Sequence, residues 1–373
     1  WFWADGRQQI GGLSLALMAL LIALAVNVGV GAMVESFRRT FTDWIDRRLA
    51  AELYVGGRDT AEGAAMAEWL ADRPEVTAVL PVWRAASRLG GAPVEVYGFR
   101  DHATYRDGWP LLAAAPGAWD AVAAGEAAMV SEQLARRAGL GLGDALVLPT
   151  PGGAWDLRVA GVHPDYGNPL GQVMVAADAL AARFPEADRG RFGVRVDPAA
   201  VPALAAELTA AFGLAPDRMV DQASLKAASL QVFERTFAAT AALNVLTLGV
   251  AGVALLTSLL TLSDLRLAQA APLWAMGVTR RRLAALEVAR TLALAGLTAL
   301  AALPAGLAVA WVLTAVVNVE AFGWRLPVRL FPVDALRLCA LALATAALAA
   351  LWPALRLGRA APLDLLRRFS NER

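Results

Sequence analysis

Few residues of this chain have the types and spacing that catalysis or cofactor binding requires. Lys226 is the only lysine and lies in Ser-Leu-Lys-Ala, so the chain lacks the Gly-Lys-Ser/Thr loop that cradles nucleotide phosphates. His102 and His163 occur without a cysteine cluster and without His-Glu-x-x-His spacing, which argues against a zinc site. Ser131 is not part of Gly-x-Ser-x-Gly and fits a helix N-cap. We therefore expect no catalytic, cofactor-binding or metal-binding residues, and a chain that is not an enzyme.

One polar stretch stands out, and it runs His163-Pro-Asp-Tyr-Gly-Asn-Pro169. Its density of turn-forming residues favours an ordered loop. Loops on a rigid scaffold also carry binding residues, so contact with a substrate or partner is the alternative. The candidate residues for such contact are Asp165, Tyr166, Gly167 and Asn168.

The composition is that of a membrane protein. The chain has 373 residues, of which 58% are hydrophobic, and a mean hydropathy of +0.50; soluble domains lie nearer half apolar. The net charge of +1 gives no argument for nucleic acid binding. Cys339 is the single cysteine and lies in an apolar run, so no disulfide framework is expected.

Four segments without charged residues are long enough to be membrane spans: 8–34, 236–263, 291–319 and 338–355. The first is too long for a signal peptide core, and we interpret Trp1 as an interior residue of a longer protein. Glycines and Asn27 in the first span favour close helix packing and an interhelical hydrogen bond, with a pathway residue as the alternative reading of Asn27. Pro304 and Pro353 lie within the third and fourth spans, and Pro304 predicts a kink.

The distribution of arginine predicts the orientation of these spans. The loop 264–290 and the tail 356–373 carry five arginines each, whereas the loop 320–337 carries three beside two acidic residues. Short arginine-rich loops stay in the cytoplasm. Both ends of the chain and the loop 264–290 are therefore expected in the cytoplasm, and residues 35–235 outside it.

Two amphipathic helices are expected to lead out of and back into the membrane. Residues 35–53 place apolar side chains at the helical period, and residues 221–235 lead directly into the second span. A membrane-surface helix also fits the first pattern. As the two legs of a stalk they would use these side chains: Phe37, Phe41, Trp44, Ile45, Leu225 and Phe233.

Between these helices the sequence is typical of a soluble α+β domain of residues 54–220. Strands are predicted at Val76–Leu80, Val94–Phe99, Ala145–Leu148, Leu157–Val162, Gln172–Val175 and Phe192–Val196. Helices are predicted at Thr60–Ala71, Ser131–Ala138 and Pro198–Phe212, and Gly139 follows the second. At this length the domain can bury a core of its own.

The loop 264–290 contains a short predicted helix with an apolar patch. Pro272 suits its first turn, Gly277 its end, and Thr279 the cap of the next helix. Such a patch in a cytoplasmic loop indicates a docking surface, although Trp274 could instead anchor the loop at the membrane interface. The candidate docking residues are Pro272, Leu273, Trp274, Ala275, Met276, Gly277, Val278, Thr279 and Arg280.

The sequence LWAMGVTRRRL, set between two spans, resembles the coupling loop of FtsX/MacB-type ABC transporter permeases (the FtsX-like permease family), although Ala270-Ala271-Pro272 stands where that family usually has a glutamate. GAMVESFRRTFTDWIDRRLAAELYV resembles the same family after its first span. AAMVSEQLARRAGLGLGDALVL and VAGVHPDYGNPLG are similar to the periplasmic domain of MacB-type permeases. The first residues resemble the second half of long, YbbP-like permeases.

The resemblance implies an α-helical membrane protein with four transmembrane helices and an inserted extracytoplasmic α+β domain, the MacB-like periplasmic core domain. The expected parts are residues 1–53 (first span and stalk helix), 54–220 (periplasmic domain), 221–235 (return stalk helix) and 236–373 (FtsX-like permease domain with three spans). The expected location is the bacterial inner membrane, with the large domain in the periplasm.

The resemblance also implies a permease subunit of the mechanotransmission type. It would move or extract lipid-linked or amphiphilic substrates at the outer face, and a separate cytoplasmic ABC ATPase would bind the ATP. Its other expected partners are membrane lipid, a second permease half or copy (pseudo-dimer or homodimer) and a periplasmic protein. An FtsX-like signalling scaffold that regulates cell-wall hydrolases is the alternative. A membrane-anchored periplasmic enzyme is disfavoured because no catalytic constellation is present.

Overall fold

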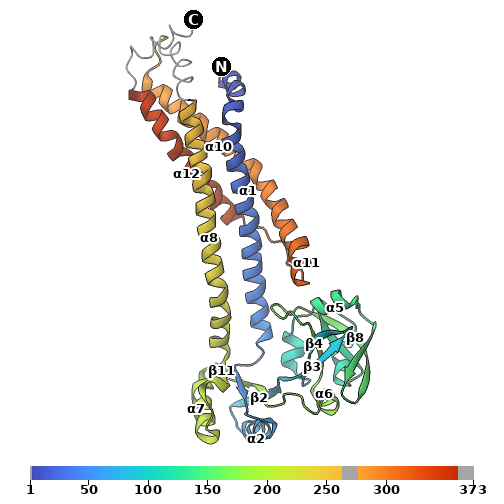
Figure 1. Ribbon diagram of the computed structural model, residues 1–373. Helices are drawn as coiled ribbons and strands as arrows, with labels where there is room; N and C mark the ends of the chain where they lie inside the picture. Colours follow the sequence, from blue (N-terminus) through green and yellow to red (C-terminus); the bar gives the residue numbers. More distant parts are fainter. Residues whose placement is uncertain (1, 263–275, 360–373) are drawn as a thin grey trace. The chain divides into compact units, whose positions relative to one another are not determined.

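The computed structural model describes residues 2–262 and 276–359, with side chains placed for 13–215, 217–231, 238–262 and 276–355. The chain divides into two compact units (Figure 1). Unit 1 takes in Trp1–Ser36, Arg235–Val317 and Pro327–Arg373, and unit 2 takes in Phe37–Glu234 and Asn318–Leu326.

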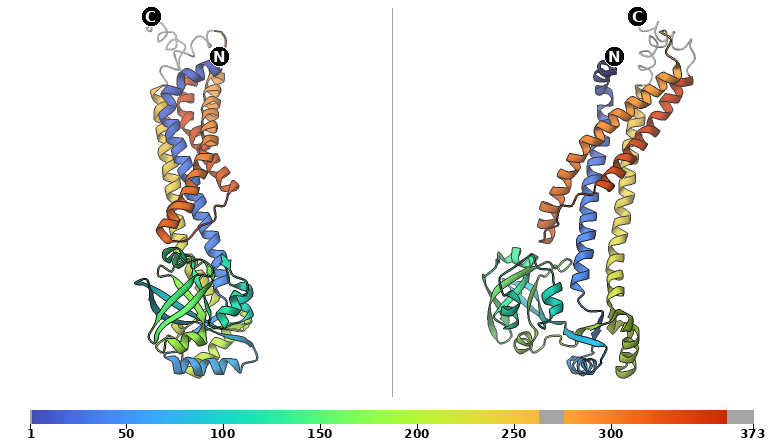
Figure 2. Two further views of the ribbon diagram at one scale, coloured as in Figure 1. Left: turned by 90° about the vertical axis from the view of Figure 1, so that its right-hand side faces the viewer. Right: turned by 180° about the vertical axis from the view of Figure 1, so that it is seen from behind.

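Unit 1 consists of two long helices, α10 (Arg280–Val312) and α12 (Pro332–Arg359), and of the parts of two others, α1 (Phe2–Arg48) up to Ser36 and α8 (Gln222–Thr261) from Arg235 (Figures 1 and 2). Within the part of the chain that the structure describes, four helical stretches are long and apolar enough to cross a bilayer: Leu13–Arg48, Ala238–Thr261, Arg280–Phe322 and Pro332–Leu355. This agrees with the four predicted spans.

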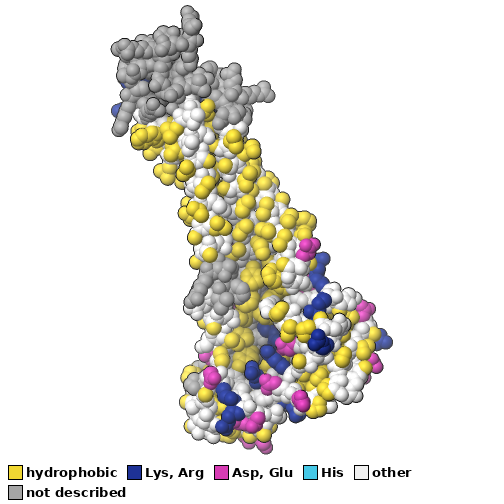
Figure 3. Space-filling view, viewed as in Figure 1, with side chains coloured by type: hydrophobic (Ala, Val, Ile, Leu, Met, Phe, Trp, Pro, Cys, Tyr) yellow, Lys and Arg dark blue, Asp and Glu magenta, His cyan; other side chains and the backbone are white. Residues whose placement is uncertain are grey.

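The interior of unit 1 is formed by leucine on α1 and α8 and by alanine on α10 and α12. Its buried residues include Leu20, Leu24, Leu255, Ala299, Ala302 and Ala346. Alanine lets helices approach closely, which is how helices associate in a membrane. The outward faces are apolar as well: Leu15 is 79% exposed and Leu348 71%. Figure 3 shows hydrophobic side chains over these helices.

Two contacts in unit 1 depend on small or polar residues of the first span. A Cβ added at Gly306 would lie 2.7 Å from Cβ of Val28 and 3.0 Å from the carbonyl oxygen of Ala25, so α1 and α10 touch through a glycine. Asn27 accepts a hydrogen bond from Thr247 Oγ1 at 3.0 Å and donates to the Asn244 carbonyl at 3.3 Å. The predicted interhelical role of Asn27 is therefore confirmed.

The start of α10 at Arg280 agrees with the predicted cap at Thr279, so the end of the loop 264–290 is helical. Helix boundaries differ from the predicted spans at two places. After Val312 the chain forms a π-helical turn (η3, Leu313–Val317) and the short helix α11 (Asn318–Phe322). α12 begins at Pro332, a residue suited to a first helical turn. Pro304 and Pro353 lie inside helices, as predicted.

Unit 2 contains a four-stranded antiparallel sheet with the strand order β11-β1-β10-β2. Its strands are β1 (Leu53–Gly56), β2 (Val76–Pro81), β10 (Arg191–Val196) and β11 (Met219–Asp221). Helices α2 (Thr60–Ala71) and α7 (Val201–Phe212) share a core with this sheet, which includes Met66, Leu70, Val194, Leu204 and Leu208.

The second sheet of unit 2 has seven strands and mixes parallel with antiparallel pairs (Figure 2). Its order is β3-β4-β9-β6-β8-β5, with β7 paired to β8. The strands are β3 (Trp83–Leu89), β4 (Ala92–Phe99), β5 (Ala113–Ala114), β6 (Ala127–Ser131), β7 (Ala145–Thr150), β8 (Gly153–His163) and β9 (Gln172–Ala176). β4 and β9 are parallel, as are β6 and β8.

Short helices complete unit 2: α3 (Ala103–Gly108), α4 (Ala118–Ala123), α5 (Glu132–Ala138), α6 (Ala177–Arg183), and the 3₁₀ turns η1 (Pro198–Ala200) and η2 (Pro216–Arg218). Ser131 caps α5, since its hydroxyl accepts from the Leu134 amide at 3.4 Å, and Gly139 ends this helix with φ at 65°. Both were predicted.

All six predicted strands and all three predicted helices of this domain are confirmed within a few residues. The predicted helix 35–53 is wrong at its end, because α1 stops at Arg48. Leu53 is 1% exposed and already belongs to β1, and the Glu52 amide donates to the Val194 carbonyl. The pairing of β1 with β10 and β11 thus ends the helix.

Candidate functional site

Of the predicted docking residues, 276–279 directly precede α10, and Arg280 is its first residue. Pro272, Leu273, Trp274 and Ala275 are outside the described residues. Met276 is 73% exposed, and Gly277 has φ at 92°, a backbone conformation that favours glycine. Thr279 occupies the N-cap position of α10 with an extended backbone, but its side chain makes no capping hydrogen bond. We call residues 272–280 the coupling segment; its described residues 276–279 directly precede the first residue of α10, Arg280.

The predicted stalk side chains of α1 are not an exposed stripe. Phe41 and Ile45 are buried at 8% and 5% exposure. The rings of Phe37 and Phe41 stack at 5.7 Å, and Trp44 follows Phe41 at 5.6 Å. Lys226 of α8 forms an ion pair with Asp46 of α1, and Gln222 Nε2 donates to the Leu49 carbonyl.

Of the two stalk residues predicted on α8, Leu225 lines a cavity of unit 2, and the Phe233 side chain lies outside the described residues. The hydrogen bond and ion pair between Asp46, Leu49, Gln222 and Lys226 hold the ends of α1 and α8 together in unit 2.

The α1 aromatics join two other parts of unit 2 in one cluster. We call Phe37, Phe41, Trp44, Tyr166 and Trp324 the aromatic cluster. Trp44 meets Tyr166 at 5.4 Å, Tyr166 meets Trp324 at 4.6 Å, and Phe37 meets Trp324 at 5.8 Å between ring centroids. Aromatic pairs at these distances are favourable beyond the area they bury. The cluster therefore fixes α1 to residues 163–169, called here the polar loop, and to the segment after α10.

That segment, Asn318–Leu326, is called here the docking segment, and it is part of unit 2 although the chain on both sides belongs to unit 1. Trp324 and Leu326 are 5% and 4% exposed. Asn318 Nδ2 donates to the Trp324 carbonyl at 2.8 Å, and the Arg325 amide donates to Glu132 Oε1 at 3.2 Å. Burial raises the pKa of Glu132, and the Arg325 amide opposes this rise.

The polar loop is ordered by its own hydrogen bonds. Asn168 Nδ2 donates to Asp165 Oδ2 at 2.8 Å, and Asn168 Oδ1 accepts from the Leu170 amide at 3.0 Å. Gln133 Nε2 donates to the Asp165 carbonyl. Gly167 has φ at 92°. The same residues line a cavity, so loop order and ligand contact are compatible.

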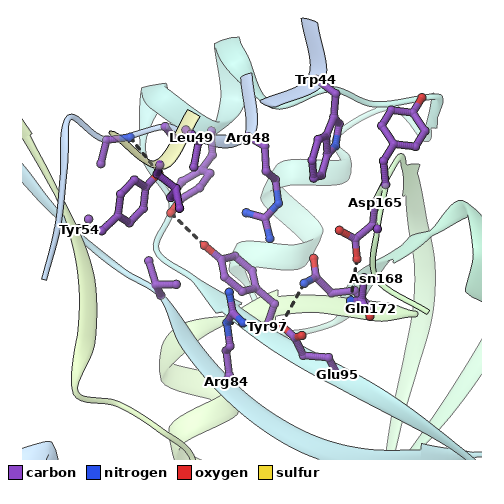
Figure 4. Close-up of a pocket in the computed structure, with 18 of the residues that line it drawn as sticks. Trp44, Arg48, Leu49, Tyr54, Arg84, Glu95, Tyr97, Asp165, Asn168 and Gln172 are labelled. Atoms are coloured by element: carbon purple, nitrogen blue, oxygen red, sulfur yellow. Dashed lines mark hydrogen bonds and ion pairs between the residues drawn. The ribbon is translucent and has the colours of Figure 1, made fainter. Parts of the chain in front are cut away.

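This cavity, the first cavity of unit 2, has a volume of about 630 Å³ and lies between the end of α1, strands β3, β4 and β9, and the polar loop (Figure 4). Arg48 reaches into it from α1. Its guanidinium lies 4.9 Å from the ring centroid of Tyr97 and 4.3 Å from that of Trp109. Such stacking stabilises a partly desolvated cation.

The polar groups opposite Arg48 come from the sheet and the loop. Arg84 Nε lies 3.5 Å from Glu95 Oε1, which also accepts from Gln172 Nε2 at 3.2 Å. Figure 4 shows the Gln172 amide and the Asp165 carboxylate facing Arg48. Burial raises the pKa of Asp165, and the positive charge of Arg48 opposes this rise.

His163 lies at the end of β8 with no exposed surface. Burial, assisted by the charge of Arg48, lowers its pKa from 6.5 to about 3, so the ring is neutral at neutral pH. We assign the proton to Nδ1, which then donates to the Pro164 carbonyl at 3.3 Å. Sequence reasoning grouped His163 with the polar loop, but the structure gives it a place in the interior.

No group of three or more metal-ligating side chains occurs among the residues that the structure describes. Sequence reasoning missed Arg48, Arg84, Glu95, Tyr97 and Gln172 as cavity residues. One signal could have drawn attention to Glu95, because a carboxylate is unusual inside the apolar run of β4. Arg48 follows Arg47 at a helix end and looks like an ordinary surface cation.

Two family descriptions match the chain. The MacB-like periplasmic core domain matches residues 13–211, which is more than half of the chain, and the FtsX-like permease C-terminal domain matches residues 241–362. An uncharacterised ABC transporter permease protein of Mycobacterium tuberculosis is 28% identical over 376 residues. That alignment covers 94% of this chain and 43% of the relative, so the chain spans less than half of the relative's length.

Two solved structures resemble part of the chain. One is the periplasmic region of MacB from Actinobacillus actinomycetemcomitans, with a TM-score of 0.35 and 14% identity over 48% of this chain and 94% of that one. The other is the extracellular domain of the noncanonic ABC-type transporter YknZ from Gram-positive bacteria, with a TM-score of 0.33 and 16% identity over 46% of this chain and 98% of that one.

Proposed function

Because the chain belongs to the family of FtsX/MacB-type ABC transporter permeases, we propose that it transmits the movement of a separate ATPase to a domain outside the membrane. ATP binds to the ATPase and not to this chain. The four apolar segments of the sequence contain no charged residue, whereas a hydrophilic pathway usually has ionisable groups in the membrane. This supports a substrate that is lipid-linked or amphiphilic and is moved at the outer face.

The observation that carries this proposal is the course of the chain from the coupling segment to unit 2. α10 begins at Arg280, directly after that segment, and runs through η3 and α11 into the docking segment. The docking segment is held in unit 2 by Trp324 and by the Arg325 amide. A displacement of the coupling segment along the axis of α10 would therefore be passed through the continuous chain to the docking segment, and so to unit 2.

The proposed permease function implies three kinds of partner. A cytoplasmic ABC ATPase contacts residues 272–280, a second permease half or copy completes the transporter, and lipid surrounds the apolar helices. Unit 2 lies in the periplasm and the helices in the inner membrane, an orientation supported by the arginine-rich segments 264–290 and 356–373.

The coupling step is tested by Trp274→Ala and Gly277→Pro. Proline requires φ near −65°, which is incompatible with the φ of 92° at Gly277. Both variants should insert and fold, but retain less than a tenth of the ATPase on co-purification, since truncating an interface tryptophan costs about 2 kcal/mol or more at a hot spot.

The matched control is Leu112→Ala, which truncates a side chain that is 53% exposed in unit 2 and should leave ATPase binding unchanged. Equal ATPase recovery with the parent and both loop variants would falsify the coupling assignment. Recovery of a cell-wall hydrolase beside the ATPase would favour the signalling scaffold.

Orientation is tested with single cysteines in a Cys339→Ala background. Leu142→Cys should react with an impermeant thiol reagent added outside the cell, because Leu142 is 43% exposed in unit 2. Arg281→Cys should react only after the membrane is opened. Labelling of Arg281→Cys from outside would reverse the assigned orientation.

A further inference from the structure

The first cavity of unit 2 adjoins a second one. The second cavity has a volume of about 730 Å³, and both are lined by Tyr54, Val82, Arg84 and Leu225. Ligand pockets commonly have volumes of about 300 to 1,000 Å³, so each cavity could hold a small molecule or part of a larger one. We call these two cavities with shared lining residues the groove; residues of both sheets of unit 2 line it.

Arg48 lines the first cavity without an ion-pair contact among the described residues, although the Asp165 carboxylate faces it. It is half-buried and rests on Tyr97 and Trp109, and within the described part of the chain no carboxylate forms an ion pair with it. A desolvated charge without a partner is costly, and guanidinium suits bidentate binding of phosphate or carboxylate. An anionic ligand would supply the missing partner.

Arg84 can assist Arg48 from the opposite side of the first cavity. It lies on both cavities, its side chain is 47% exposed, and its contact with Glu95 is loose at 3.5 Å. The second cavity adds arginines that already have partners: Arg58 with Glu62 and Arg191 with Asp188. Arg48 in the first cavity and Arg218 in the second line the groove without an ion pair among the described residues.

A second observation points to a ligand at the same place. Gln172 is 2% exposed, and its Oε1 is buried without a hydrogen-bond partner among the described residues. Buried polar atoms usually have a partner. In Figure 4 this amide faces the space beside Arg48, so a ligand N–H or O–H next to the anionic group would satisfy it.

The remaining wall of the first cavity is apolar. Trp44, Tyr54, Tyr166 and Leu225 line it beside the charged groups. Trp44 is already fixed, because its Nε1 donates to the Pro164 carbonyl at 3.0 Å. Rigid aromatic faces next to a few polar groups are typical of sites that bind a molecule with an apolar part.

We infer that this groove binds an anionic amphiphile. Arg48 and Arg84 hold its phosphate or carboxylate group, and its apolar part lies against Trp44, Tyr54 and Leu225. The role of the groove as the substrate site of a transporter rests on the proposed function, whereas the binding of an anionic amphiphile in it does not. The ligand comes either from a membrane lipid or from a soluble organic anion, since both present the same chemistry.

Binding is measured by calorimetry on the full chain in a neutral detergent, with hexyl phosphate, hexanol, inorganic phosphate and dihexanoyl phosphatidate as probes. Hexyl phosphate should bind at least tenfold more tightly than inorganic phosphate or hexanol. Tenfold tighter binding of dihexanoyl phosphatidate than of hexyl phosphate indicates a lipid source, and the reverse order indicates a soluble anion. No detectable binding of either amphiphile would overturn the site.

Variants locate the binding in the groove. Arg48→Gln should weaken hexyl phosphate binding at least tenfold. Arg84→Gln removes a half-exposed cation and should weaken it about threefold. Arg88→Gln is the matched control, because Arg88 is exposed on the same strand and donates to the Gly91 carbonyl instead; it should bind like the parent.

The proposal is overturned if Arg48→Gln and Arg84→Gln bind as tightly as the parent, or if Arg88→Gln weakens binding as much as they do. Thermal melting without ligand shows that each variant is folded, and Arg84→Gln decides the matter should Arg48→Gln fail to fold. Loss of ATPase co-purification in the coupling variants is a separate result, so failure of the binding site and failure of the permease proposal are distinguishable.

Discussion

The rings of Tyr166 and Trp324 lie 4.6 Å apart between centroids, with their planes inclined by 58°. Tyr166 belongs to the polar loop after β8, and Trp324 belongs to the docking segment that follows α10 and α11. This pair therefore connects the segment that follows α10, the third apolar helix, to the α+β domain that follows α1, the first. Under the proposed function, it is the contact through which a movement of α10 would reach unit 2.

Tyr166→Leu and Trp324→Leu should show an interaction energy in a double-mutant cycle. Because the rings touch and both are at least nine-tenths buried, the loss in the double variant should be smaller than the sum of the single losses by about 0.5 to 1.5 kcal/mol. Thermal melting of the full chain in neutral detergent gives the four values.

The control cycle pairs Trp324→Leu with Phe212→Leu, whose ring contacts Trp69 elsewhere in unit 2, and should be additive. Additivity in the first cycle would mean that Trp324 does not dock on Tyr166.

A fragment of residues 50–224 should fold on its own, and the shorter fragment 55–220 should be less stable. β1 supplies Leu53 to the core, and Glu52 Oε2 accepts from Arg195 Nε at 3.0 Å and from the Val196 amide at 3.1 Å. Losing one buried leucine costs about 2 to 5 kcal/mol, which corresponds to at least about 4 °C in melting temperature for a domain of this size. Circular dichroism during heating compares the two. Equal melting temperatures would show that β1 contributes nothing.

The sequence predicts most of the fold because its signals are local. In β8 apolar and polar residues alternate, β4 is an apolar run interrupted by Glu95, and in α5 Ser131 and Gly139 mark both ends. β6 was missed because Ala-Ala-Met-Val-Ser lacks the β-branched density of a strand, although all five of its residues are buried. β1 and β11 were missed because they are short, and each is a strand only through its long-range partner.

The candidate site was predictable only in part. The polar loop and the aromatic stripe of α1 were each singled out by residue type. Their contact with Trp324 was not, since one sequence does not reveal which distant aromatic residues meet. Arg48 was missed for the same reason: the neighbouring Arg47 has an identical side chain but is exposed, and only the tertiary structure places Arg48 over Tyr97 and Trp109.

Gly306→Ala should destabilise the helices of unit 1, whereas Gly31→Ala should not. The new methyl group at position 306 would lie 2.7 Å from Val28 Cβ and 3.0 Å from the Ala25 carbonyl oxygen, closer than atoms normally approach. Overpacking of this kind costs about 1 to 3 kcal/mol. Gly31 lies on α1 with no atom within 4 Å of an added Cβ, so its variant is the control. Melting temperatures in neutral detergent compare them, and equal values for both variants would contradict the close crossing of α1 and α10.

His163 should make the chain less stable in acid, and His163→Asn should remove that effect. Its pKa falls from 6.5 to about 3 on folding, chiefly through burial, so between these pH values the unfolded chain binds more protons than the folded chain. Stability is then lost as pH falls, by about 2 kcal/mol at pH 5 relative to pH 8, or about 4 to 8 °C in melting temperature. Asparagine can still donate to the Pro164 carbonyl but does not titrate.

The raised pKa values of Asp165 and Glu132 act in the opposite direction, but they act in the parent and in the variant alike and cancel in the comparison. If the melting temperatures of parent and variant change equally between pH 8 and pH 5, His163 is not the buried neutral group that its surroundings require.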